Sequence, residues 1–272
     1  MRVAVCQLRS TDDVEANLSS AERLVREAAA GGADLAVLPE YVASLGSRDG
    51  LASSAEPLGE GPITRRMAGW AGELGIWLLG GTVVEQAAGH RYDTAPLFDR
   101  DGELVAHYRK IHLFDVELPG QPAFRESAVF APGQELVTRA TEQVRLGLSI
   151  CYDLRFPELF RGLMALGAEV VLVPAQFQHL TGSAHWHVLL RARAIENQCF
   201  VVAAAQWGTY GDPAQGRRSY GHSMVVDPWG TVLAEAPEEG DAVLFADLDP
   251  AELRRVRKAL PALQHRRLGL VC

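Results

Sequence analysis

The chain has 272 residues, of which 48% are hydrophobic and 22% charged, and its formal net charge is −8. This balance is typical of a folded globular protein, so it excludes a largely disordered or collagen-like chain. The acidic charge also excludes a general basic field for nucleic acid, and we expect no nucleic-acid partner.

Apolar runs that suit strands alternate along the chain with segments of helical periodicity. The N-terminal half predicts strands at 3–8, 35–38 and 77–84, helices at 17–30 and 64–74, and a hairpin over 97–108 that turns at 99–102. The C-terminal half predicts strands at 144–151, 169–173, 199–205, 222–227, 231–235 and 243–247, helices at 157–166 and 184–198, and a last helix opened by Pro250. This mixed order favours an α/β fold with helices layered over sheet, and leaves the number of sheets open.

The segment 111–135 has no clear period and is rich in proline and glycine. A loop of this length inside a compact domain is usually functional. Because the chain shows no internal repeat and no linker, we expect a single domain over 1–272.

The cysteines and apolar runs indicate the compartment. Cys6, Cys151, Cys199 and Cys272 are scattered and form no C-x-x-C pair, which argues against a zinc ribbon or a disulfide scaffold. Residues 1–8 turn polar too soon for a signal peptide, and runs such as 200–205 are too short to span a bilayer. We therefore expect a cytoplasmic protein with no membrane partner.

Cys151 lies where an apolar strand is followed by a short turn and a helix opened by Pro157. A thiol there is exposed at the sheet edge, and the positive end of the helix dipole favours its thiolate. The next backbone N–H groups can face an oxyanion. The alternative is an inert buried cysteine.

Two charged residues also follow predicted strands. Glu40 comes directly after Leu38-Pro39, near the mouth of the sheet, where a carboxylate can act as a general base for a thiol. Lys110 ends the hairpin, and an ammonium beside a thiol lowers the thiol pKa and stabilises negative charge. Each taken alone also fits a surface charge, and Glu40 also fits a helix cap.

Two further residues have open roles. By composition Glu126 is a loop acid. Arg155 either grips a substrate carboxylate with both guanidinium nitrogens or pairs with Asp153 or Glu158.

Several other chemistries lack support. There is no G-x-S-x-G, no G-x-G-x-x-G and no P-loop. His185 and His187 lie two residues apart on a predicted helix, so they face different directions and make a poor metal pair. The basic stretch 254–267 fits a solvated helix face better than a polyanion site.

Together these residues resemble the Glu-Lys-Cys triad of the nitrilase (carbon–nitrogen hydrolase) superfamily. The matching motifs are LPEY with Glu40, YRKIHLFD with Lys110 and CYDLRFPE with Cys151, and the resemblance runs from residue 3 to 267. Segments 182–186, 189–196, 220–230 and 264–267 resemble the deaminated glutathione amidases of the Nit branch. One departure is His187, where an acid is more usual in the family.

The resemblance implies a four-layer α-β-β-α sandwich, usually paired through helices into a homodimer, with no metal and no organic cofactor. It implies amide hydrolysis through a thioester. Glu40 takes the proton of Cys151, Lys110 and the backbone N–H of Tyr152 hold the oxyanion, and Glu126 positions the substrate or assists proton transfer.

The implied substrate is deaminated glutathione, a 2-oxo acid amide that gives 2-oxoglutarate and cysteinylglycine. Arg155 suits its carboxylate, while Phe177 and Thr181 are either pocket walls or ordinary loop packing. The first alternative is an omega-amidase acting on 2-oxoglutaramate or 2-oxosuccinamate, which shares the triad but usually differs around 203–206 and 223–224. The alternative from another class is a non-catalytic scaffold of nitrilase type, and nucleic-acid binding rests only on the basic stretch. The Nit-branch segments argue against nitrile and N-carbamoyl amide hydrolysis.

Overall fold

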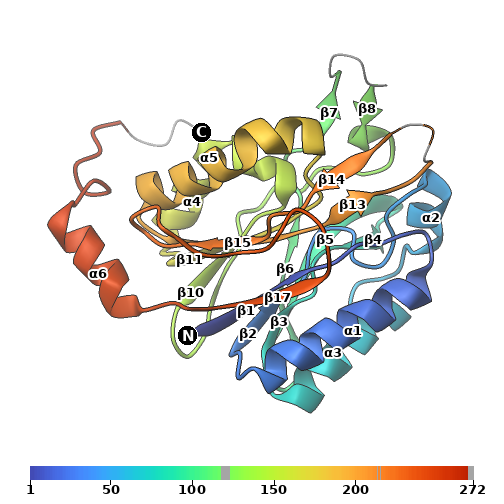
Figure 1. Ribbon diagram of the computed structural model, residues 1–272, viewed down its shortest axis with the longest axis horizontal. Helices are drawn as coiled ribbons and strands as arrows, with labels where there is room; N and C mark the ends of the chain where they lie inside the picture. The colour runs from blue at the N-terminus through green and yellow to red at the C-terminus, as the bar shows by residue number, and fades with distance from the viewer. Residues whose placement is uncertain (118–122, 213, 215, 269–272) are drawn as a thin grey trace.

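The structure is a computed structural model that describes residues 1–117, 123–212, 214 and 216–268 (Figure 1). Cys272 and the middle of the predicted loop 111–135 lie outside the described residues.

Two β-sheets form the centre of the described chain. The first contains β1 (Arg2–Gln7), β2 (Leu35–Val37), β3 (Trp77–Leu79), β4 (Val83–Ala87), β5 (His90–Phe98), β6 (Leu104–Arg109) and β17 (Ala242–Asp247). The second contains β9 (Thr138–Ala140), β10 (Arg145–Leu148), β11 (Val170–Ala175), β12 (Phe200–Ala205), β15 (Met224–Val226) and β16 (Val232–Glu235). Their orders are β17-β1-β2-β3-β5-β4, with β6 paired to β5, and β16-β15-β12-β11-β10-β9. The inner strands β1-β2-β3 and β10-β11-β12 run parallel.

Helices cover the outer face of each sheet (Figure 1). The first sheet carries α1 (Val14–Ala30) and α3 (Pro62–Leu74), and the second carries α4 (Pro157–Ala165) and α5 (His179–Asn197). The remaining helices are the short α2 (Arg48–Ser53) and the C-terminal α6 (Pro250–Ala259). This arrangement confirms the expected α-β-β-α sandwich.

The alternation of side chains along the strands explains the layers. In β1, Val3 and Val5 pack into the core between the two sheets, whereas Ala4 and Cys6 pack in the core that lies beneath α1 and α3. Because both faces of β1 are covered, its four central residues, 3–6, are all apolar. The predicted apolar stripe of the first helix is confirmed: its buried residues include Leu18, Ala21, Leu24, Val25 and Ala28.

The structure corrects two predicted elements. The strand predicted at 77–84 is two strands, because Gly81 has a φ of +66° and lies against Pro39, where a Cβ would be 2.1 Å from the backbone oxygen. The helix predicted at 184–198 begins five residues earlier, at His179, so Thr181 is helical rather than in a loop.

Short elements that the sequence did not predict lie mainly around one end of the sandwich. They are α2, β9, β7 (Asp115–Val116), β8 (Phe124–Arg125), η1 (Glu126–Ala128), η2 (Cys151–Arg155), β13 (Trp207–Thr209) and β14 (Arg218–Tyr220). No helix in the described part of the chain is both long enough and apolar enough to cross a membrane.

Candidate active site

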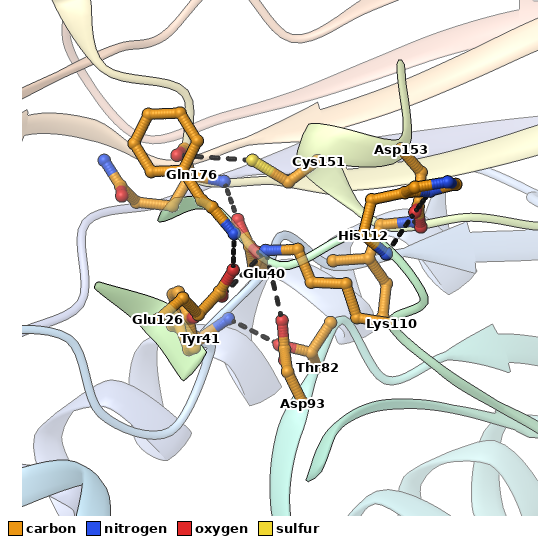
Figure 2. Close-up of polar contacts among 12 residues, drawn as sticks. Glu40, Tyr41, Thr82, Asp93, Lys110, His112, Glu126, Cys151, Asp153 and Gln176 are labelled. Carbon is orange, nitrogen blue, oxygen red and sulfur yellow. Dashed lines mark hydrogen bonds and ion pairs between the residues drawn. The ribbon is translucent and has the colours of Figure 1, made fainter. Parts of the chain in front are cut away.

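Strand ends from both sheets meet at one pocket (Figure 2). Lys110 directly follows β6, Glu40 comes three residues after β2, and Cys151 opens η2 beyond β10. The structure brings every predicted site residue to this pocket, whose walls include Glu40, Lys110, Glu126, Cys151, Tyr152, Arg155, Phe177 and Thr181.

Lys110 joins the acids of the pocket. Its Nζ donates to Glu40 Oε1 at 2.7 Å and to Glu126 Oε1 at 2.8 Å, and its side chain is only 1% exposed. Burial alone would lower the pKa of Lys110, but the carboxylates of Glu126 and Glu40 raise it well above its usual value. The ammonium is therefore a fixed positive charge next to the thiol.

Glu40 is held through both carboxylate oxygens. Besides the bond from Lys110, its Oε2 accepts the backbone N–H of Gln176 at 2.5 Å. Burial raises the pKa of Glu40, although Lys110 opposes the shift. A carboxylate with a raised pKa that lies in the same pocket as the Cys151 thiol is equipped to accept a proton from it.

Cys151 adopts a left-handed backbone conformation, with a φ of +44°, which is strained for a residue with a Cβ. Its Sγ donates to the Gln176 carbonyl at 3.5 Å. Burial and the charge of Glu40 raise the pKa of the thiol well above its usual value, although Lys110 opposes them. The prediction that the helix dipole favours a thiolate is therefore wrong for the resting site, where burial is the larger effect.

The backbone after Cys151 offers an oxyanion donor. The first bond of η2 runs from the Asp153 N–H to the Ile150 carbonyl at 2.9 Å. Tyr152 precedes that donor, so its N–H is not needed by the 3₁₀-helix. An oxyanion near Cys151 can therefore lie between this N–H and the Lys110 ammonium.

Glu126 is not a solvated loop acid. It is 3% exposed, and besides Lys110 it accepts the Tyr41 hydroxyl at 2.5 Å and the Phe114 backbone N–H at 2.5 Å. Composition alone missed this burial, and only the family resemblance marked the residue.

Asp93 is a site residue that sequence reasoning missed. Its Oδ2 lies 3.7 Å from Lys110 Nζ, and its side chain is fully buried. Burial and the charge of Glu40 raise the pKa of Asp93 well above its usual value, although Lys110 opposes the shift. In the sequence, Asp93 is one acid beside an apolar run, a pattern common in strands that have one face in water, so it does not mark a site residue.

Asp153 ties the Lys110 and Cys151 segments together. It accepts the Tyr108 hydroxyl at 2.8 Å and the Ile150 N–H at 2.9 Å, and its Oδ1 lies 2.7 Å from His112 Nδ1. Asp153 is therefore fully engaged, and the alternative that it pairs with Arg155 is wrong.

Arg155 is the cation of the pocket wall. Its guanidinium lies 4.9 Å from the Phe177 ring centroid and 3.1 Å from His185 Nδ1. No carboxylate among the described residues lies within 4 Å of it, so the alternative pairing with Glu158 is not formed either. Burial lowers the pKa of Arg155, which still leaves a charged guanidinium facing the pocket.

Two groups of described residues bring three metal-type ligands within 4.8 Å of one another. In the first, Glu40, Asp93 and Glu126 surround the Lys110 ammonium, which already occupies the space between them. In the second, Glu235 accepts from His187 and His222 at 2.8 and 2.7 Å, apart from the pocket. His185 faces Arg155 instead, which confirms that His185 and His187 point in different directions.

Known proteins resemble this chain over nearly its whole length. A model of the carbon–nitrogen hydrolase family matches residues 2–258. The deaminated glutathione amidase of Bos taurus is 46% identical over 276 residues, which cover 98% of this chain and 82% of that protein. The omega-amidase NIT2 of Mus musculus is 39% identical over 273 residues, which cover 99% and 96%.

A solved structure agrees in fold. Nit3 of Saccharomyces cerevisiae, a member of branch 10 of the nitrilase superfamily, superposes with a TM-score of 0.87 at 33% identity, covering 98% of this chain and 97% of that one.

Proposed function

The chain belongs to the carbon–nitrogen hydrolase family, as an amidase of its Nit branch, and from this premise we propose that it hydrolyses deaminated glutathione to 2-oxoglutarate and cysteinylglycine. The observation that carries the proposal is the pocket itself. One wall has a thiol with a carboxylate and an ammonium beside it. Another has the Arg155 guanidinium, which pairs with no carboxylate among the described residues and suits the carboxylate of a 2-oxo acid.

Acylation begins with proton transfer. The Cys151 thiol, whose pKa is raised, passes its proton to Glu40 as the sulfur attacks the amide carbon. The carbonyl π pair moves onto oxygen, where the Tyr152 N–H and the Lys110 ammonium stabilise the negative charge. When the C–N bond breaks, Glu40 returns the proton to the leaving amine, and a thioester remains.

Deacylation repeats the cycle with water. Glu40 takes a proton from a water molecule, the hydroxide attacks the thioester carbon, and the C–S bond breaks. Cys151 recovers a proton through Glu40. Glu126, held by Lys110, Tyr41 and Phe114, keeps the ammonium in place and is within reach of the substrate.

Substrate binding uses the opposite wall. Arg155 binds the 2-oxo acid carboxylate. The Phe177 ring packs against the Arg155 guanidinium, and Phe177 is itself 4% exposed, with its ring centroid 5.0 Å from that of Trp186. Thr181 lies in the first turn of α5 at the same pocket. The alternative, an omega-amidase acting on 2-oxoglutaramate or 2-oxosuccinamate, uses the same chemistry with ammonia as the leaving group.

Steady-state kinetics separate the two activities. We expect a higher kcat/KM for deaminated glutathione than for 2-oxoglutaramate, and a clear preference for the smaller amide overturns the ranking. The Arg155→Gln variant should lose activity on both amides, because both carry the 2-oxo acid carboxylate. Wild-type protein inactive on a broad amide panel would favour the non-catalytic scaffold instead.

We further propose that the chain is one domain and works as a homodimer in the cytoplasm, without nucleic-acid partners. The surface of α5 supports pairing, because Leu180, Val188 and Ile195 on it are exposed apolar side chains. The basic stretch is partly committed internally: Arg257 donates to the Gln198 and Ala168 carbonyls. Light scattering of wild type and Val188→Glu tests the dimer, which the variant should weaken.

A further inference from the structure

A second cavity of about 360 Å³ adjoins the candidate active site. The two share Tyr41, Phe124, Glu126 and Gln176 as wall residues, so a ligand can extend from one into the other. Its volume lies at the lower end of the range for small-molecule sites, about 300–1,000 Å³. None of the mechanistic steps above uses this space.

Arg217 supplies positive charge to the second cavity. No carboxylate among the described residues lies within 4 Å of its guanidinium. The other arginines nearby are committed: Arg125 pairs with Glu117, and Arg218 pairs with Glu238 and Glu239. Asp212 also lines the cavity, and its Oδ1 accepts the Ala214 N–H at 2.9 Å.

Tyr210 adds a neutral hydrogen-bond donor. It is 7% exposed, and its hydroxyl has no hydrogen-bond partner among the described residues, although Gln176 and Gln178 lie near it. Burial raises the pKa of Tyr210 to about 12, so the hydroxyl keeps its proton. Tyr210 and Arg217 line the same cavity, and Gln176 beside them also lines the pocket of the thiol.

We propose that this cavity binds the leaving half of the substrate, an amine that carries its own carboxylate, with Arg217 on that carboxylate and Tyr210 donating to the peptide carbonyl. The inference rests on the proposed function, in which that half is cysteinylglycine. A dipeptide extends at most about 7 Å, a length that suits a cavity sharing four wall residues with the pocket of the thiol.

Two guanidiniums then divide the recognition. Arg155 binds the carboxylate of the acyl half, and Arg217 binds that of the leaving half. An amide whose leaving group is ammonia fills only the first pocket, so the second cavity is what separates the long substrate from 2-oxoglutaramate.

The test compares Arg217→Gln with the matched control Arg218→Gln on three substrates. These are deaminated glutathione, the same molecule with a carboxamide in place of its glycine carboxylate, and 2-oxoglutaramate. For Arg217→Gln we expect kcat/KM to fall about 10- to 100-fold on deaminated glutathione alone, as expected for the loss of a charged hydrogen bond. Arg218→Gln should leave all three rates near those of the wild type.

A second variant, Tyr210→Phe, keeps the ring and removes only the hydroxyl. We expect a fall of about 3- to 10-fold on both peptide substrates and none on 2-oxoglutaramate. Equal losses on all three substrates, or full activity of Arg217→Gln on deaminated glutathione, overturn the assignment. If the wild type hydrolyses neither 2-oxo acid amide, both the proposed function and this subsite are rejected. If the wild type is active but Arg217→Gln shows no selective loss, only the subsite is rejected.

Discussion

Replacing Lys110 with methionine tests the charge balance of the pocket. The chain has only two lysines, Lys110 and Lys258, and the first is 1% exposed while the second is exposed on α6. Methionine keeps much of the length of the side chain but removes its charge. Glu40 and Glu126 would then be buried with no cation between them.

The expected loss follows from the contacts. Removing one partner of a buried ion pair costs about 3–5 kcal/mol, because the remaining charge is left uncompensated. Loss of the ammonium removes the charge that opposes the raised pKa of Glu40, so this pKa rises further and the carboxyl takes up a proton more readily. The deficit is then largest at pH values above the raised pKa of Glu40 and shrinks as pH falls and this carboxyl is protonated. Amide hydrolysis should fall at least 10²- to 10³-fold, since an oxyanion donor is lost.

Urea unfolding at pH 5 and pH 8, together with initial rates on deaminated glutathione, measures both effects. Lys258→Met is the matched control, and as a surface change it should stay within about 0.5 kcal/mol of the wild type. The reasoning is refuted if Lys110→Met is as stable as Lys258→Met at pH 8, or if it keeps more than a tenth of the wild-type rate.

Three further predictions concern the geometry and protonation of the pocket. Gly81→Ala should lose stability and activity, because its Cβ would lie 2.1 Å from the Pro39 oxygen next to Glu40. Gly89, the control, has a φ of +80° and open space around it, so Gly89→Ala should show only the cost of backbone strain. Equal losses of melting temperature and rate in the two variants contradict this prediction. Asp93→Asn should keep most activity, because the Asp93 carboxyl lies 3.7 Å from Lys110 Nζ, farther than the two glutamates, and its raised pKa already disfavours the charged form. A loss above a hundredfold in kcat would show that its charge is used. The kcat/KM profile should rise with pH through an apparent pKa above 4.5, since Glu40 must ionise, and fall above 9.0 as Cys151 deprotonates. A profile whose acid limb lies at or below 4.5 contradicts the raised pKa of Glu40.

The sequence predicted the positions of the pocket residues well for a physical reason. Glu40 and Cys151 each follow an apolar parallel strand, and the ends of parallel strands gather at one edge of a sheet. Lys110 follows β6, which pairs antiparallel to β5 and ends at the same pocket. The layer architecture followed similarly from alternating strands and helices, although the pairing of two sheets came only from the family resemblance.

Features set by tertiary contact were not predictable in this way. The thiol pKa depends on burial, which local sequence at Cys151 does not show. Asp93 reads as an ordinary strand acid until β5 is placed beside Lys110. The break at Gly81 depends on how closely Pro39 approaches, and the second cavity depends on Arg217 and Tyr210 meeting segments far away in the chain.

The central claim is that Cys151 carries the acyl group. Protein mixed with deaminated glutathione, quenched in acid and digested, should show a 2-oxoglutaryl group on Cys151 by mass spectrometry. Cys6 and Cys199 should remain unmodified, because both are fully buried away from the pocket that holds Glu40 and Lys110, and burial raises the pKa of each thiol to about 12. Cys151→Ser should show neither adduct nor turnover. An adduct on another residue, or wild-type turnover by Cys151→Ser, would contradict the account.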